Sequence, residues 1–374
     1  MTAYWSNGAR DDHRTLVVVF LRGGADGLAL VPAVGDDAYH VARPTIGIDA
    51  RDAIALDERF ALHPRLGAIA PLFRDGALEI VHAVGSDDTT RSHFEAQDLM
   101  EHGGASAGGW LGRFLRARDA GAGGALSAVA MGQEFPESLR GAPSVAVMRT
   151  LDDFAIDASD APMLGALDAL YRADANALGG RLAPAARDTL AALRRIAELR
   201  AAPRRPRAGA VYPDDDFGHS LAEVARLIRG RVGLSVATLD LGGWDSHFTQ
   251  GTLIEPLMER LARGLAAFHA DLGAAMMAGV SVVAMTEFGR RVAENASFGT
   301  DHGRGSVMFV LGAGAQGGRV RSRWPGLESR FLDGPGDVPV TTDYREVLAP
   351  ILRHHGARDA NAIFPGWRGD LSLM

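Results

Sequence analysis

The 374-residue chain contains no cysteine and no lysine. Without cysteine, the chain can form no disulfide bonds, no thiolate zinc site and no cysteine nucleophile. Without lysine, it has no Schiff-base residue and no lysine general base. All 39 basic residues are therefore arginine, and with the abundant alanine and glycine this is typical of a GC-rich genome. Any catalytic or metal-binding chemistry must come from oxygen and imidazole groups.

The chain also lacks an excess of positive charge and a long apolar run. Its net charge is −7 and its pI is near 5.9, which argues against a nucleic-acid partner. No stretch approaches the roughly 20 apolar residues that a membrane helix needs. The first 14 residues are polar and have no apolar signal-peptide core. As the sequence stands, we expect a soluble, cytoplasmic protein without a membrane span, and a periplasmic or exported one if a leader was removed.

Short apolar runs recur along the chain and are typical of strands that are buried on both faces. They span 16–21, 78–84, 144–148, 234–241, 280–285 and 307–312. Between the fourth and fifth runs, apolar residues from Leu253 to Met276 repeat at three- or four-residue spacing, which predicts a helix over 252–277. The order of strand, helix and strand predicts a mostly parallel sheet in a three-layer α/β/α sandwich.

The middle of the chain, about 103–216, is rich in alanine, glycine and arginine. It contains one predicted helix over 184–200, followed by a proline-interrupted stretch, 201–216, that reads as a loop. We interpret residues 1–374 as a single α/β domain with a helical and loop elaboration at about 103–216. The glycines after the first run have neither the dinucleotide-binding spacing nor a phosphate-binding lysine.

Acidic and histidine residues lie next to several of the apolar runs. Residues just past the carboxyl ends of parallel strands converge on one crevice, wherever they lie in the sequence. Oxygen and nitrogen ligands without sulfur suit a divalent metal, with Zn or Mn favoured, Mg or Ca possible, and one or two ions. The candidate metal ligands are Asp26, Asp245, His247, Glu287, Asp301 and His302.

Each candidate ligand also has an ordinary structural interpretation. Asp26 follows the first strand and could cap the next helix or turn. Asp245 and His247 share a face in extended geometry, so both can reach one ion; the alternative is a turn aspartate and a surface histidine. His63 and His82 lie in apolar surroundings and are expected to be structural.

Three candidates, Glu287, Asp301 and His302, leave further alternatives open. Glu287 could bind metal or form an ion pair with Arg290 or Arg291. Asp301 and His302 lie in a glycine-flanked loop that could aim both side chains inward, or Asp301 could orient a histidine that binds the metal.

The segment 85–98 offers the candidate nucleophiles. Ser92 and Glu95 have the spacing of a helix-capping box. Alternatively, Thr90 or Ser92 is a nucleophile aimed into the crevice, while the helix N-terminus and Arg91 stabilise a bound anion. His93 could be a metal ligand or a proton shuttle.

Five segments together resemble a bacterial family of sulfatase-like proteins of unknown function within the alkaline phosphatase superfamily, whose members are often exported. They are LVVVFLRGGADGL, TRSHFEAQ, GGWDSHFTQ, TEFGRRVAEN and GTDHGRG, and the resemblance runs from Leu16 to about Gly366. It implies an α/β/α core and two metals that support cleavage of phosphate or sulfate monoesters by a Ser, Thr or formylglycine nucleophile.

By this resemblance, Asp26 matches a metal-contacting aspartate, Asp245 and His247 match a ligand pair at tighter spacing, and His302 matches a late histidine ligand. TEFG stands where the superfamily usually has Asp-His-Gly, so Glu287 replaces an aspartate and Phe288 replaces a histidine ligand. That departure puts a second metal in doubt.

The nucleophile is less closely matched. Thr89 and His93 have the Ser/Thr-to-His spacing of the superfamily's phosphomutases, and the formylglycine motif of true sulfatases is missing.

Three functions follow. The first is a metal-dependent hydrolase that acts on a small anionic phosphate or sulfate ester. The second is a non-catalytic binding or assembly protein that keeps the fold. The third is a metal-dependent phosphomutase or transferase. The sequence does not fix the oligomeric state.

Overall fold

The computed structural model describes residues 14–118, 124–154, 165–166, 169 and 182–369. These residues form a mixed α/β fold around a mostly parallel sheet of nine strands, in the order β10-β4-β9-β8-β1-β7-β5-β6, with β11 also paired to β4. The strands are β1 (Thr15–Arg22), β4 (Leu78–Gly85), β5 (Ala128–Met131), β6 (Ala146–Met148), β7 (Val236–Gly242), β8 (Val280–Met285), β9 (Ser306–Gly312), β10 (Val320–Arg321) and β11 (Thr342–Asp343). A separate hairpin pairs β2 (Ile54–Ala55) with β3 (Ala61–Leu62).

All six predicted strands are confirmed, and the sheet departs from the prediction in two ways. The short, alanine-rich β5 was missed, although it pairs in parallel with both β7 and β6. Strand β9 runs antiparallel to its two neighbours, β4 and β8. The other pairings within this sheet are parallel.

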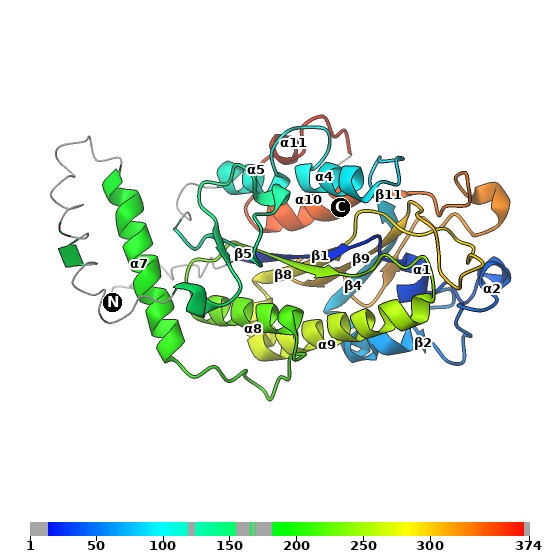
Figure 1. Ribbon diagram of the computed structural model, residues 1–374, viewed down its shortest axis with the longest axis horizontal. Coiled ribbons are helices and arrows are strands. Elements are labelled where there is room, and N and C mark those ends of the chain that lie inside the picture. The colour runs from blue at the N-terminus through cyan, green and yellow to red at the C-terminus, as the bar shows by residue number, and fades with distance from the viewer. Residues whose placement is uncertain (1–13, 119–123, 155–164, 167–168, 170–181, 370–374) are drawn as a thin grey trace, which may run out of the picture.

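Helices lie on either side of the sheet (Figure 1), with α4, α5 and α10 towards one side and α8 and α9 towards the other. The helices are α1 (Gly27–Leu30), α2 (Asp37–Ala42), α3 (Ala70–Arg74), α4 (His93–His102), α5 (Trp110–Ala117), α7 (Leu182–Ala201), α8 (Asp216–Arg229), α9 (Gln250–Met277), α10 (Tyr344–His354) and α11 (Ala360–Ile363). Short 3-10 turns cover Pro64–Ile69, Glu137–Leu139, Leu151–Phe154 and Ser329–Phe331. None of the helices in the described part of the chain is long and apolar enough to cross a lipid bilayer.

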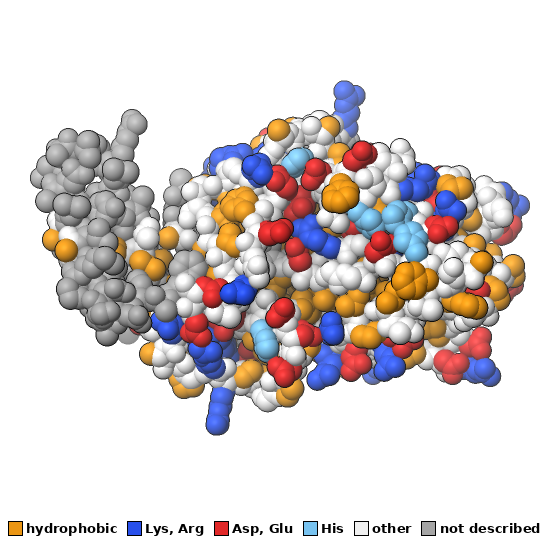
Figure 2. All heavy atoms as spheres, in the orientation of Figure 1, with side chains coloured by type: hydrophobic (Ala, Val, Ile, Leu, Met, Phe, Trp, Pro, Cys, Tyr) orange, Lys and Arg blue, Asp and Glu red, His pale blue; other side chains and the backbone are white. Residues whose placement is uncertain are grey.

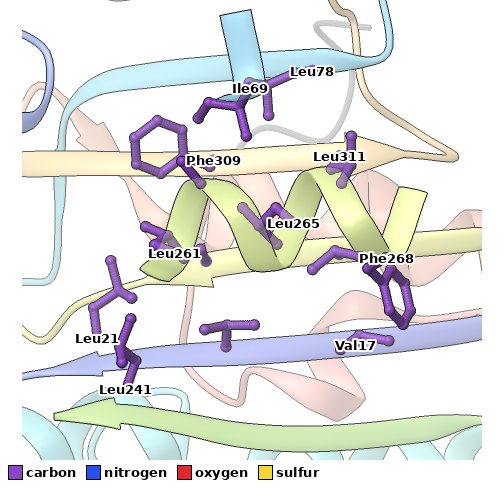
Figure 3. Close-up of a cluster of buried hydrophobic side chains, with 14 of the residues drawn as sticks. Val17, Leu21, Ile69, Leu78, Leu241, Leu261, Leu265, Phe268, Phe309 and Leu311 are labelled. Carbon is purple, nitrogen blue, oxygen red and sulfur yellow. The ribbon is translucent and has the colours of Figure 1, made fainter. Parts of the chain in front are cut away.

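Helix α9 fulfils the prediction made for 252–277 and forms much of one core. Its side chains Leu261, Leu265 and Phe268 face apolar residues of the strands, among them Leu241 and Phe309 (Figure 3). Burying each such side chain stabilises the fold by about 1.5–3 kcal/mol. A second buried cluster fills the opposite side of the sheet, where Trp110 and Phe114 of α5 pack. The two cores hold the sheet rigidly and fix the position of its edges.

The stretch 103–216 contributes to the sheet as well as to its surroundings. Strands β5 and β6 both lie within it and extend the sheet beyond β7. Helix α7 confirms the helix predicted over 184–200. Residues 119–123, 155–164, 167–168 and 170–181 of this stretch lie outside the described residues, and its interpretation as an elaboration on a single domain stays a prediction.

His82 is a structural core histidine, as expected, and it should make the protein sensitive to acid. Its ring is fully buried in β4, where Nε2 contacts the Val31 carbonyl oxygen at 3.0 Å and Nδ1 accepts the Ala83 N–H at 2.8 Å. Burial lowers the pKa of His82 to about 4. The unfolded chain therefore binds more protons between about pH 4 and 6.5, so the free energy of unfolding falls as the pH falls through that window.

We expect a loss of at most about 1.4 kcal/mol per pH unit from this group. Urea denaturation at pH 7, 5.5 and 4.5 should show a shallower pH dependence in His82→Gln than in the parent protein. His219→Gln, at a side chain that is 59% exposed, is the control and should keep the parental slope. An unchanged slope in His82→Gln would contradict the assignment.

Candidate metal centre

Four segments meet at one edge of the sheet because of the strand directions. Strands β1, β4, β7 and β8 all run the same way, so their carboxyl ends share this edge. Strand β9 is antiparallel and begins there. The loops after β1 and β7, the segment between β4 and α4, and the loop that connects β8 to β9 therefore come together, as expected for residues just past the carboxyl ends of parallel strands.

Three imidazole rings converge at this edge, and we refer to His93, His247 and His302 as the histidine cluster. The Nε2 atom of His302 lies 3.1 Å from Nε2 of His93 and 2.9 Å from Nε2 of His247. Nitrogen ligands about 2.0–2.1 Å from one tetrahedral zinc ion would lie about 3.3 Å apart, close to these separations. The rings form a compact group on the surface in Figure 2.

The hydrogen bonds behind the rings fix where their protons lie. Nδ1 of His302 lies 2.8 Å from the Arg91 carbonyl oxygen, which can only accept a hydrogen bond. Nδ1 of His93 lies 2.8 Å from Oε1 of Glu287. Both rings therefore carry their proton on Nδ1 and present an Nε2 lone pair to the centre. Lone pairs that face one another at 3.1 Å repel unless a proton or a metal cation lies between them.

Asp245 adds a carboxylate to the cluster. Its Oδ1 lies 3.1 Å from Nε2 of His247 and 3.5 Å from Nε2 of His302, and its Oδ2 lies 3.6 Å from Nε2 of His93. One ligand atom from each of Asp245, His93 and His302 can be chosen so that all lie within 4.8 Å of one another. Burial alone would raise the pKa of Asp245, but the hydrogen bond and charge of Arg290 outweigh it and hold the pKa below its usual value. The carboxylate is therefore ionised and available to a cation.

Arg290 holds this edge of the sheet together, a role that the sequence did not indicate, since it suggested Arg290 only as a possible ion-pair partner of Glu287. Its guanidinium is buried and donates to the carbonyl oxygens of Gly23, Gly24 and Thr300 at 2.6–3.1 Å, and to Oδ1 of Asp245 at 2.7 Å. One side chain thus connects the loops after β1 and β7 to the loop before β9.

Glu287, a predicted metal ligand, is placed instead as the support of His93. It is fully buried, and its Oε1 accepts hydrogen bonds from Gly23 N, His93 Nδ1 and Gln97 Nε2 at 2.8–2.9 Å. Burial pushes its pKa up, but these hydrogen bonds outweigh burial and the net effect is a lowered pKa. An ionised carboxylate on Nδ1 orients the ring and makes Nε2 a better metal donor. The alternative ion pair of Glu287 with Arg290 or Arg291 is not formed.

Asp301 takes the corresponding place beside His247. Its Oδ1 lies 3.5 Å from Nδ1 of His247, and its carboxylate also contacts Asn295 and Arg291 at 3.3 Å. Of the two interpretations that the sequence left open, the geometry favours Asp301 as the residue that orients a histidine, and that histidine is His247.

Asp26 is engaged elsewhere. It caps α1 through the Leu28 N–H, and both of its oxygens accept hydrogen bonds from Arg43, at 2.6 and 3.1 Å. Its Oδ2 also accepts from Gln250 at 2.8 Å. The pair is buried, with both side chains about 1% exposed, so Asp26 acts as the capping residue that the sequence allowed and we leave it out of the metal site.

The three residues before His93 make contacts that differ from the predicted ones. Thr90 is exposed and donates to Oδ2 of Asp88 at 3.0 Å. The Arg91 guanidinium is bound to Asp337 and to the Gly334 carbonyl oxygen, so it anchors a neighbouring loop and is not available to an anion. Ser92 stands at the N-cap of α4, but its hydroxyl makes no capping hydrogen bond, so the predicted capping box with Glu95 is not formed.

Phe288 lies where the resemblance leads one to expect a second set of ligands. Its ring is 5% exposed and packs on His93 and His302, with ring centroids 4.7 and 5.0 Å apart. It also lies against Gly24, where an added Cβ would be 2.5 Å from the ring. The space beside the histidine cluster is filled by an apolar ring.

Gln97 is a further residue that the sequence analysis missed. It lies four residues after His93 on α4, the spacing that puts two side chains on one face of a helix, so the TRSHFEAQ segment held the signal. Its amide nitrogen donates to Glu287 and its amide oxygen accepts from Arg22 at 3.0 Å. Gln97 thereby helps to fix the carboxylate that supports His93.

Replacing Glu287 with glutamine tests the supporting role directly. The amide is nearly the same size as the carboxylate but is neutral, so His93 should be a weaker donor, and we expect metal affinity to fall about 10- to 100-fold. Zinc competition titration with a chromophoric chelator measures the change. Glu294→Gln, which alters a carboxylate bound to the Thr45 and Ile46 N–H groups, is the matched control. Unchanged zinc affinity in Glu287→Gln would show that the carboxylate does not tune the site.

A family model described as a protein of unknown function (DUF1501) matches residues 13–364 of the chain. No curated protein and no solved structure matches the chain. The matched residues include the whole histidine cluster, Asp245 and the residues that support them. The chain therefore belongs to the DUF1501 family.

Proposed function

We propose that the protein is a metal-dependent hydrolase of phosphate or sulfate monoesters, with a three-layer α/β/α fold of the alkaline phosphatase type. The observation that carries the proposal is that Nε2 of His302 lies 3.1 Å from Nε2 of His93 and 2.9 Å from Nε2 of His247, with the Nδ1 atoms of His93 and His302 held by acceptors on the far side of each ring. Three imidazoles and one carboxylate suit zinc, and manganese is the second choice.

A bound divalent ion would supply Lewis-acid polarisation of an ester oxygen and would lower the pKa of a hydroxyl group beside it. The chain's own residues do the rest. Glu287 and Asp301 orient two of the rings, and Arg290 holds Asp245 in its ionised form. Because Asp245 is 47% exposed, the cluster is open to solvent on that side and a small anionic ester can reach it.

Ser92 is the best-placed nucleophile of the two hydroxyls proposed from the sequence. It directly precedes His93, stands at the N-terminus of the ten-residue helix α4, and has no capping bond to break. Thr90, by contrast, is exposed and bonded to Asp88. The helix N-terminus favours the negative charge that develops on an attacked ester.

The proposal is tested by assaying the zinc- and manganese-loaded protein on an aryl phosphate and an aryl sulfate. We expect hydrolysis that disappears on chelation, and a loss of at least about 100-fold in kcat in Ser92→Ala, the range that removal of an activated hydroxyl or its base produces. Thr90→Ala should retain activity. Turnover that survives in Ser92→Ala would assign attack to water, and no turnover on either ester would contradict hydrolase function.

A second candidate is a metal-binding protein without catalysis. The observation that favours it is Phe288, which fills the position where a second ligand set would stand. It predicts tight binding of one ion and of an anion, with no turnover and no effect of Ser92→Ala on anion affinity.

A further inference from the structure

Three phenylalanine side chains are exposed on the segments that carry the histidine cluster. Phe94 follows His93 and is 86% exposed, Phe248 follows His247 and is 59% exposed, and Phe298 stands four residues before His302 and is 52% exposed. We call these three residues the phenylalanine rim. Hydrophobic side chains are visible on more than one side of the pale blue histidines in Figure 2.

The part of the rim that holds Phe248 and Phe298 is a built structure. The Thr249 and Gln250 N–H groups donate to the carbonyl oxygens of Ser297 and Phe298 at 2.9 and 2.8 Å, so the two segments are tied together. Gly299 lies so close to His247 that an added Cβ would be 2.2 Å from its backbone carbon. This close packing fixes the backbone of Phe248 and Phe298 next to the backbone of His247.

The backbone of this part is also strained. Thr249 and Phe298 both adopt left-handed conformations, with φ of 40° and 59°. Such values are uncommon for residues other than glycine, and for a bulky aromatic residue they are a genuine outlier. Strain of this kind costs about 1–3 kcal/mol per residue and persists where the surrounding structure enforces it, often at functional sites. Here the strained backbone of Phe298 carries an aromatic side chain that is exposed to solvent.

We propose that the phenylalanine rim binds an apolar, preferably aromatic, group of the ester substrate, next to the anionic group that reaches the histidine cluster. This inference rests on the proposed function and names its substrate class: a phosphate or sulfate monoester of a phenol or a comparably flat apolar alcohol. The rim lies on the same segments as the cluster, so both halves of such a molecule can be bound at once. Aromatic side chains supply large contact area and favour stacked or edge-to-face contacts with a ring.

Charge supports this choice of occupant. The rim residues lie on the same segments as Asp245 and the three imidazoles, so these apolar side chains alternate along the chain with polar ones. A protein partner would need a broad surface of about 800 Å² on each side. A small ester with one charged end and one apolar end matches the alternation of charged centre and aromatic rim.

The test compares the binding of phenylphosphonate and methylphosphonate to the zinc-loaded full chain by isothermal titration calorimetry. Both ligands resist hydrolysis and differ only in the apolar group. We expect phenylphosphonate to bind at least about 10-fold more tightly, and each of Phe94→Ala and Phe248→Ala to reduce this preference by about 3- to 10-fold, the range for one aromatic contact. Affinity for methylphosphonate should stay unchanged in both variants.

Phe135→Ala is the matched control, because Phe135 is 46% exposed but lies in the loop after β5 and on none of the segments of the cluster. It should keep the parental preference. Binding of both phosphonates without a phenyl preference would overturn the proposed role of the rim in substrate binding while leaving the proposed function intact. A preference that survives Phe94→Ala and Phe248→Ala would do the same. Binding of neither phosphonate would overturn the proposed function and the rim with it.

Discussion

Replacing His302 with alanine is expected to abolish tight metal binding. His302 is the central ring of the cluster, since its Nε2 lies within hydrogen-bond distance of both other Nε2 atoms. Loss of a residue that merely supports a ligand costs about 10- to 100-fold in affinity, and removal of the ligand itself should cost more than about 100-fold. Zinc competition titration measures the affinity, and aryl ester hydrolysis should fall in parallel.

The alanine variant should remain folded, because the His302 ring is partly exposed and its loop is held by backbone bonds, among them Gly303 N to the Gly289 carbonyl oxygen. Circular dichroism and urea denaturation establish this. His219→Ala, at an exposed histidine of α8, should bind zinc as the parent does. If His302→Ala kept parental zinc affinity, the ion would have to bind elsewhere.

Replacing Arg290 with methionine is expected to destabilise the protein by about 3–5 kcal/mol, the range for removal of one partner from a buried charged network. Methionine keeps much of the length of the side chain but cannot donate. The carbonyl oxygens of Gly23, Gly24 and Thr300 would lose their buried donor, and each unsatisfied group adds a desolvation cost of about 1–3 kcal/mol. Urea denaturation measures the change.

Arg263→Met is the control for Arg290→Met. Arg263 lies on α9, is 49% exposed and contacts Glu259 at 3.5 Å, so its loss should change the free energy of unfolding by less than about 1 kcal/mol. A similarly small change in Arg290→Met would show that the edge of the sheet does not depend on this guanidinium. Zinc affinity should fall in Arg290→Met but not in Arg263→Met, because only Arg290 holds Asp245.

The fold could be predicted well where a local pattern decides it. The mainly apolar runs of β1, β4, β7, β8 and β9 identify buried strands, and the repeat along α9 identifies its core-facing side. The short strand β5 has only four residues and lies in an alanine-rich stretch, so nothing local separates it from its surroundings. The reversed direction of β9 depends on which strands it lies between, which a single sequence does not reveal.

The site was predicted by position rather than by role. Placing polar residues at strand ends correctly grouped Asp245, His247 and His302, and it located Glu287 and Asp301 beside them. Position alone could not decide whether a carboxylate binds the metal or accepts a hydrogen bond from the Nδ1 of a metal-binding histidine. The two sites are only a few ångströms apart. Asp26 was assigned to the metal because its partner, Arg43, lies 17 residues away and carries no sign of the pairing.

Anomalous diffraction from crystals of the zinc-loaded protein, recorded at the zinc edge, tests the central claim most directly. We expect one strong peak per chain, within about 2.0–2.2 Å of Nε2 of His93, His247 and His302 and of an Asp245 oxygen, with no second peak beside Phe288. A peak located away from the histidine cluster, or no peak after loading with excess zinc, would contradict the assignment of this edge of the sheet as a metal centre.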